Sequence, residues 1–121
     1  MKELSIIVFT HHLPQLTEIL RKYNIAGMAS HEIHATGHTK RKETPEIVLA
    51  YHYGKMVTPE TEKRTKVETL VPDSVAENVI QELVSSLGSE SEPGGLVYVT
   101  DVSNAYLLGT KRSGDSLLIK E

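Results

Sequence analysis

The chain has 121 residues, 39% of them hydrophobic and 24% charged, which fits one domain with a core of its own. A formal net charge of −3 argues against a broad basic surface for nucleic acid, and without cysteine the chain has no disulfide, thiolate nucleophile or thiolate zinc site. Its apolar runs are too short to span a bilayer, and its N-terminus lacks the build of a signal peptide. We therefore expect a cytoplasmic protein without direct membrane insertion.

The first part of the chain predicts a strand, a helix and a second strand. Residues 4–9 form a β-branched apolar run that is typical of a strand. Pro14 suits the first turn of the helix that follows, and Asn24 marks its end. The apolar residues on one face of this helix are Leu13, Leu16, Ile19 and Leu20. Residues 27–36 predict the second strand, although polar and apolar residues alternate poorly there.

A long polar segment separates the two halves. It runs from residue 37 to about residue 61, and within it residues 47–51 predict a strand of their own. A loop this long inside a small domain is usually functional or disordered, so we expect residues from about 40 to 61 to be mobile without a ligand or partner. Residues 66–71 then predict a clear strand that places Val67, Thr69 and Val71 on one face.

The second helix has the strongest local signals. Ser74 and Glu77 predict a capping box, and Gly88 ends the helix. Its apolar stripe is Val75, Val79, Ile80, Leu83, Val84 and Leu87. Strands over residues 96–102 and 105–108 and a polar tail follow.

This order of elements predicts the fold. Two βαβ halves joined by a long loop favour an α+β, ferredoxin-like βαββαβ arrangement, an antiparallel sheet with both helices on one face. The other face of so small a sheet needs cover, and a partner subunit commonly provides it. We expect a homo-oligomer.

The loop of residues 88–95 is rich in glycine and serine. Adjacent glycines can bring backbone N–H groups close to a ligand, and such concavities favour phosphates. Clusters of this composition more often make ordinary turns. A phosphate-binding loop and a plain turn therefore both remain open for this segment.

Short motifs occur along the chain in a fixed order: Ile25-Ala26-Gly27-Met28, Thr36-Gly37-His38, Leu70-Val71-Pro72-Asp73, Gly94-Gly95-Leu96-Val97-Tyr98-Val99, Gly109-Thr110 and Gly114-Asp115-Ser116-Leu117. In order and spacing they resemble the PII signal-transduction family over nearly the whole chain. The resemblance implies one domain over residues 1–121. Within this domain the resemblance places a T-loop at about 38–62, a B-loop at about 88–95 and a C-terminal loop at about 109–121.

The resemblance also implies a function. PII proteins are homotrimers that bind an adenine nucleotide in each cleft between subunits, and their T-loop docks onto a membrane transporter or a metabolic enzyme of nitrogen or carbon metabolism. The residues it places at the nucleotide are Ile7, Gly27, Met28, Ala29, Thr36, Gly37, His38, Arg64, Glu68, Leu70, Pro93, Gly94, Gly95, Leu96, Thr110, Lys111 and Arg112. It implies no catalytic residue.

Several residues depart from the family pattern. Leu96 stands where typical members have a B-loop lysine, and Leu107 and Gly109 align with two arginines that hold phosphates. Arg64 keeps one cationic contact, with Lys111 and Arg112 as candidates to compensate. Charge-assisted hydrogen bonds contribute ~1.5–3 kcal/mol each. We therefore expect ADP or AMP to compete well with ATP.

Two other groups of residues can be interpreted either as functional sites or as ordinary structural or surface residues. Tyr51 falls where classical members are uridylylated, but its surroundings differ and favour a strand aromatic. His31, His34 and His38 suggest a metal site. On a strand His31 and His34 point to opposite faces, which favours ordinary surface histidines, so no metal is predicted.

Alternatives to a PII-like regulator come from two other classes. One is a trimeric divalent-metal-binding protein of the same shape, resembling the CutA family. The other is a small enzyme acting in the intersubunit cleft, although neither a nucleophile elbow nor a Walker loop occurs in the sequence.

Overall fold

The structure is a computed structural model that describes residues 1–36, 62–88 and 94–120. The elements in chain order are β1 (Lys2–Val8), the 3-10 turn η1 (Thr10–His12), α1 (Leu13–Lys22), β2 (Ala29–Ala35), β3 (Glu62–Val71), α3 (Asp73–Ser86), β4 (Gly95–Asp101) and the 3-10 turn η3 (Asp115–Leu117). Within the described ranges, no helix is both long and apolar enough to cross a membrane.

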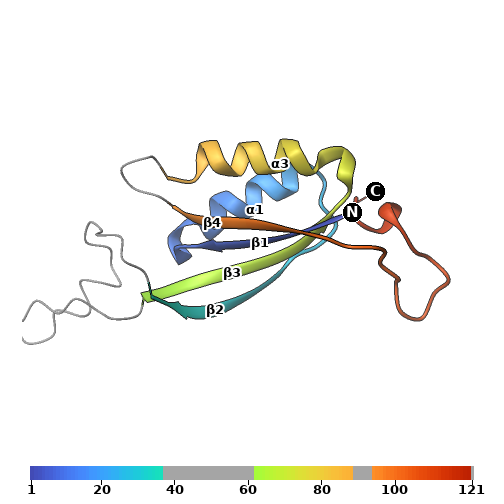
Figure 1. Cartoon of the computed structure of the whole chain (residues 1–121), viewed down its shortest axis with the longest axis horizontal. Coiled ribbons are helices and arrows are strands. Elements are labelled where there is room, and N and C mark those ends of the chain that lie inside the picture. Colours follow the sequence, from blue (N-terminus) through green and yellow to red (C-terminus); the bar gives the residue numbers. More distant parts are fainter. Residues whose placement is uncertain (37–61, 89–93, 121) are drawn as a thin grey trace, which may run out of the picture.

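The strands form one antiparallel sheet in the order β2-β3-β1-β4. Both helices lie against the same face of this sheet (Figure 1). The architecture is therefore α+β with ferredoxin-like topology, as the sequence predicts. We call the face without helices the open face.

The core lies between the sheet and the two helices. Side chains alternate along a strand, so β1 sends Leu4, Ile6 and Val8 towards the helices and Ile7 to the open face. The other buried apolar residues of this core are Leu16, Ile19, Leu20, Ile25, Val67, Val71, Ala76, Val79 and Leu83. The predicted inward face of β3 is confirmed, since Val67, Thr69 and Val71 are all buried.

The first helix matches its prediction closely. Pro14 lies in its first turn, where the missing N–H costs no hydrogen bond. Asn24 follows the helix with a positive φ of 58°, a left-handed conformation that asparagine tolerates and that stops the helix. An ion pair of 2.6 Å between Lys22 and Glu82 links this helix to α3.

The capping box predicted for the second helix is wrong. The helix begins at Asp73 with Pro72 as its N-cap and has no side-chain cap hydrogen bond. Ser74 is therefore already inside the helix, where its hydroxyl no longer faces the free N–H groups of the first turn. Val84 is also misassigned, because its side chain is 63% exposed next to the buried Leu83. Gly88 follows the helix with a φ of 97°, as expected of a helix stop.

The strand predicted over residues 105–108 is absent from the structure. In its place Tyr106 forms an isolated bridge with Ser113. The chain then returns to the segment between α1 and β2, where Ala26 N–H donates to Leu118 C=O over 2.8 Å and Lys120 N–H to Asn24 C=O over 2.7 Å. The polar tail thus has an ordered, packed part.

Other strand limits shift by a few residues. β1 begins at Lys2 and ends at Val8, β2 occupies only Ala29–Ala35, and β4 ends at Asp101. β3 begins at Glu62, before the predicted residue 66, because its first residues pair with the end of β2. The strand predicted over residues 47–51 lies outside the described residues, as does most of the T-loop.

Candidate functional site

The predicted nucleotide residues fall into groups at opposite ends of the sheet. Arg64, Gly94 and Gly95 lie at the end of the sheet where β1 ends, whereas Gly27 and Leu70 lie at the end where β1 begins. The register explains this, because Gly95 pairs with Val8 at the end of β1 and Leu70 pairs with residue 3 at its beginning. Ile7 and Glu68 lie between these ends.

A cavity of about 360 Å³ brings five of the predicted residues together: Gly27, Met28, Ala29, Glu68 and Leu70. Its remaining lining is Glu3, Ala26, Thr69, Leu117 and Leu118. The Thr69 hydroxyl donates to the Gly27 carbonyl over 2.6 Å, which fixes the turn after α1 against β3. We call this space the linker cavity.

Sequence reasoning did not foresee Glu3, Leu117 and Leu118 in this cavity. Leu117 and Leu118 reach the cavity because the C-terminal tail pairs with the segment between α1 and β2. The pairing is an isolated β-bridge between Ile25 and Ile119. A single β-bridge of this kind cannot be predicted from the local sequence. Glu3 and Glu68 give the cavity an acidic side, which disfavours phosphate and favours groups that donate hydrogen bonds.

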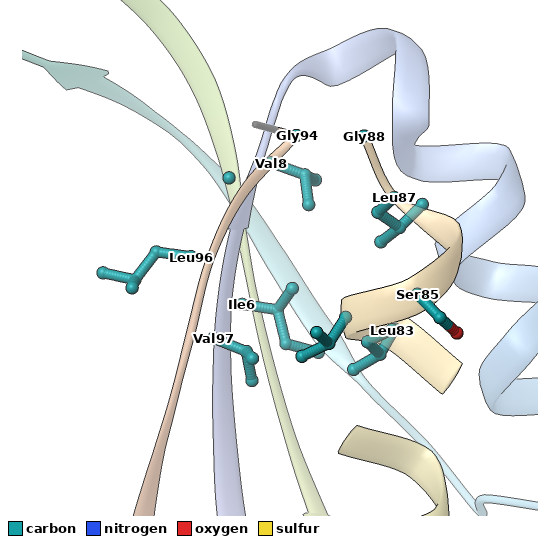
Figure 2. A pocket seen from close by; sticks show the side chains of 11 residues that line it. Ile6, Val8, Leu83, Ser85, Leu87, Gly88, Gly94, Leu96 and Val97 are labelled. Atoms are coloured by element: carbon teal, nitrogen blue, oxygen red, sulfur yellow. The ribbon is translucent and has the colours of Figure 1, made fainter. Parts of the chain in front are cut away.

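A second, larger hollow of about 560 Å³ lies at the other end of the sheet, between α3 and β4. Its lining includes Gly88, Gly94 and Gly95 and is otherwise mostly apolar. Figure 2 shows Val97 turned towards Ile6 and Leu83, whereas Leu96 points away from them on the other side of β4. Leu96 is 60% exposed and so forms part of the outer surface.

The two adjacent glycines of this end have a packing role of their own. A Cβ on Gly94 would lie 2.4 Å from the Leu87 carbonyl oxygen, and one on Gly95 would lie 1.9 Å from that of Ile7. Gly95 also has a φ of 147°, which other residues rarely adopt. Glycine is therefore required for the start of β4 to lie so close to α3 and β1.

Arg64 lies beside the beginning of the η1 turn. Its guanidinium carbon is 4.1 Å from the centre of the Phe9 ring. The ring of His11 stacks on Phe9 with centres 5.5 Å apart, and His12 lies 4.3 Å from His11. Burial, followed by the neighbouring His11, lowers the pKa of His12. Arg64 carries its positive charge throughout the physiological pH range.

A polar cluster occupies the middle of the open face. The register places Ser5 between Glu68 and Tyr98. A hydrogen bond from Lys66 lowers the pKa of the Tyr98 phenol, with a smaller contribution from Ser5. The hydrogen bond to Tyr98, followed by that to Glu68, raises the pKa of Lys66. Ser5 is only 2% exposed although no helix covers it.

The C-terminal loop carries Thr110, Lys111 and Arg112 on the surface. The Arg112 N–H donates to the Thr110 hydroxyl over 3.0 Å, which shapes the turn. This loop lies at the end of the molecule opposite the start of β4 (Figure 1). Within one chain, Lys111 and Arg112 therefore do not join Arg64 at one site.

The comparison with known proteins assigns the family. The family model described as nitrogen regulatory protein P-II matches residues 1–112. The chain belongs to the P-II family. A curated relative, the nitrogen regulatory protein P-II of Rhodobacter capsulatus, is 23% identical over 115 residues, which cover 95% of this chain and 97% of the relative. The predicted resemblance is thus confirmed, and P-II proteins are signal-transduction regulators rather than enzymes.

The P-II match does not support the metal-binding alternative. His31 and His34 are exposed on β2, opposite Lys66 and Lys63 respectively. Among the residues that the structure describes, no group of three or more acidic or histidine side chains is placed to hold a metal ion. These histidines fit the reading as surface residues.

The nucleotide-binding roles predicted for the P-II site residues all remain predictions. Thr36 is exposed directly after β2. Gly37, His38, Tyr51 and Pro93 lie outside the described residues, so their predicted roles remain predictions.

Proposed function

We propose that this protein is a P-II regulator that binds an adenine nucleotide in the clefts between the subunits of a homotrimer. Its T-loop controls a membrane transporter or a metabolic enzyme in the cytoplasm, in response to nitrogen or carbon status. The observation that carries the proposal is the family match together with the linker cavity, which gathers Gly27, Met28, Ala29, Glu68 and Leu70.

The linker cavity suits the nucleoside part of the ligand. Met28 and Leu70 offer apolar contact to a flat base, and the carboxylates of Glu3 and Glu68 can accept hydrogen bonds from an exocyclic amine or a ribose hydroxyl. The same carboxylates repel phosphate, so the phosphates belong elsewhere. This supports a base subsite at this end of the sheet.

The phosphates fit the other end of the sheet, near Arg64 and the backbone of Gly94 and Gly95. These residues flank the end of β1 on either side, from β3 and β4. Arg64 supplies a fixed positive charge, and backbone N–H groups can hold an anion. Because the two ends lie apart in one chain, a compact site needs the linker cavity of one copy and the Arg64 end of another.

The open face supports assembly into a homotrimer. Apolar Ile7 and Leu70 lie on it beside the paired polar cluster of Lys66, Glu68 and Tyr98. Charges that are already paired and hydrogen-bonded cost less to bury than isolated ones. Such a face can pack against its own copies while Lys66, Glu68 and Tyr98 keep their partners.

The assembly is tested by light scattering. We expect the mass of a trimer at micromolar concentration. We also expect Ile7→Glu to produce monomers, because it adds a carboxylate to the open face opposite Lys66, whose ammonium is already engaged by Tyr98 and Glu68. Circular dichroism of the variant checks that the monomer stays folded. A monomeric wild-type protein contradicts the trimer and removes the intersubunit site.

The ligand is tested by calorimetry with ATP, ADP, AMP and adenosine. We expect ADP or AMP to bind about as well as ATP, since Leu96, Leu107 and Gly109 supply no countercharge for a third phosphate. We expect Arg64→Ala to lower the affinity for ADP by roughly tenfold or more and the affinity for AMP by less, because the lost side chain is charged and faces the phosphates.

Adenosine is the internal control in this experiment. Its affinity depends on the linker cavity alone and stays unchanged in Arg64→Ala. A protein that binds ATP far more tightly than ADP contradicts this site, and then Lys111 and Arg112 supply the missing countercharge. Turnover of the bound nucleotide would favour the enzyme alternative.

A further inference from the structure

The ring of Phe9 lies against the guanidinium of Arg64. The Arg64 Cζ is 4.1 Å from the ring centre, within the range of a cation–π contact, and Phe9 itself is only 9% exposed. A planar guanidinium stacks on an aromatic face, whereas a lysine ammonium is a compact point charge. The ring therefore limits the directions that the Arg64 side chain takes.

Neighbouring contacts fix the ring in turn. The hydroxyls of Thr10 and Thr65 lie 3.1 Å apart, one residue from Phe9 and one residue from Arg64 respectively. His11 stacks on the ring with an interplanar angle of 26°. These contacts hold the η1 turn against β3 next to Arg64. They also restrict the movement of the Phe9 ring.

We propose that Phe9 is a positioning residue, whose ring holds the Arg64 guanidinium in the orientation that meets the phosphates of the ligand. This inference rests on the proposed function and deepens it. One fixed arginine at the phosphate end replaces part of the charge that Leu96, Leu107 and Gly109 do not supply. An oriented guanidinium offers two parallel N–H groups to a phosphate and loses less entropy on binding than a free side chain.

The test measures ADP and adenosine affinities of the wild type, Phe9→Leu and Phe9→Tyr. Phe9→Leu keeps an apolar side chain but removes the ring, so we expect ADP to bind about 5- to 10-fold more weakly and adenosine to bind unchanged. Phe9→Tyr keeps the aromatic ring, so we expect it to bind ADP as tightly as the wild type does. Unchanged adenosine binding also shows that Phe9→Leu remains folded.

A double substitution separates positioning from a general loss of structure. Lysine at position 64 keeps the charge but has no planar face for the ring to hold. We therefore expect Phe9→Leu to lower the ratio of ADP to adenosine affinity in the wild type, and to leave it unchanged in an Arg64→Lys background. An equal fall in both backgrounds contradicts the positioning role.

Nuclear magnetic resonance tests the contact without any ligand. Ring currents of Phe9 should shift the Arg64 side-chain proton signals upfield in the wild type and in Phe9→Tyr. A wild type without this shift, or a Phe9→Leu variant that binds ADP as the wild type does, overturns the positioning role alone. A wild type that binds neither ADP nor adenosine overturns the proposed function, and the positioning role with it.

Discussion

Gly95→Ala is expected to lower the free energy of unfolding by about 3 kcal/mol and the melting temperature by roughly 10 °C. The new Cβ would lie 1.9 Å from the Ile7 carbonyl oxygen, and the backbone at this position has a φ of 147°. Both the clash and the unfavourable φ involve backbone atoms, so no side chain can move to relieve them. Thermal unfolding followed by circular dichroism measures the loss.

Gly27→Ala is the matched control for this substitution. A Cβ on Gly27 meets nothing within 4 Å, and its φ is an ordinary one. We expect its melting temperature to stay near that of the wild type or to rise slightly, since alanine restricts the unfolded chain. Equal melting temperatures for Gly95→Ala and Gly27→Ala would show that the start of β4 does not lie as close to β1 as described.

Leu96→Lys is expected to raise the affinity for ATP by about tenfold or more. It places an ammonium group beside Gly94 and Gly95, where typical P-II proteins carry a lysine, and one charge-assisted hydrogen bond contributes ~1.5–3 kcal/mol. The fold should tolerate it, because Leu96 is 60% exposed and points away from the core side of β4 (Figure 2). Calorimetry with ATP and ADP measures the change.

Leu96→Met is the control for charge, since it keeps an apolar side chain of similar length. We expect it to bind ATP and ADP as the wild type does. If Leu96→Lys binds ATP no better than Leu96→Met, the phosphates lie away from this strand. The proposed division of the ligand between the two ends of the sheet would then be wrong.

The sequence was sufficient to predict the order of most elements but not all of their ends. Apolar periodicity identified α1, and alternation identified the inner face of β3, because burial against the core imposes both patterns. The capping box at Ser74 failed because Pro72 already fixes the entry to α3. Residues 105–108 look like a strand from composition, yet only Tyr106 finds a bridging partner.

The candidate site was predictable in part for a different reason. The motif around Gly27 and Met28 identified one wall of the linker cavity, and five predicted residues do meet there. Leu117 and Leu118 were missed because they join through contacts distant in sequence, which carry no periodic signal. The contact of Phe9 with Arg64 was missed likewise, since it depends on how η1 turns back onto β3.

The wall that Leu117 and Leu118 give to the linker cavity determines when the cavity is complete during synthesis. These residues follow β4, so they leave the ribosome after every strand of the sheet. The nascent chain can therefore pair its strands and bury its core before this wall exists. The nucleotide binding that we propose at this end of the sheet therefore requires the finished domain.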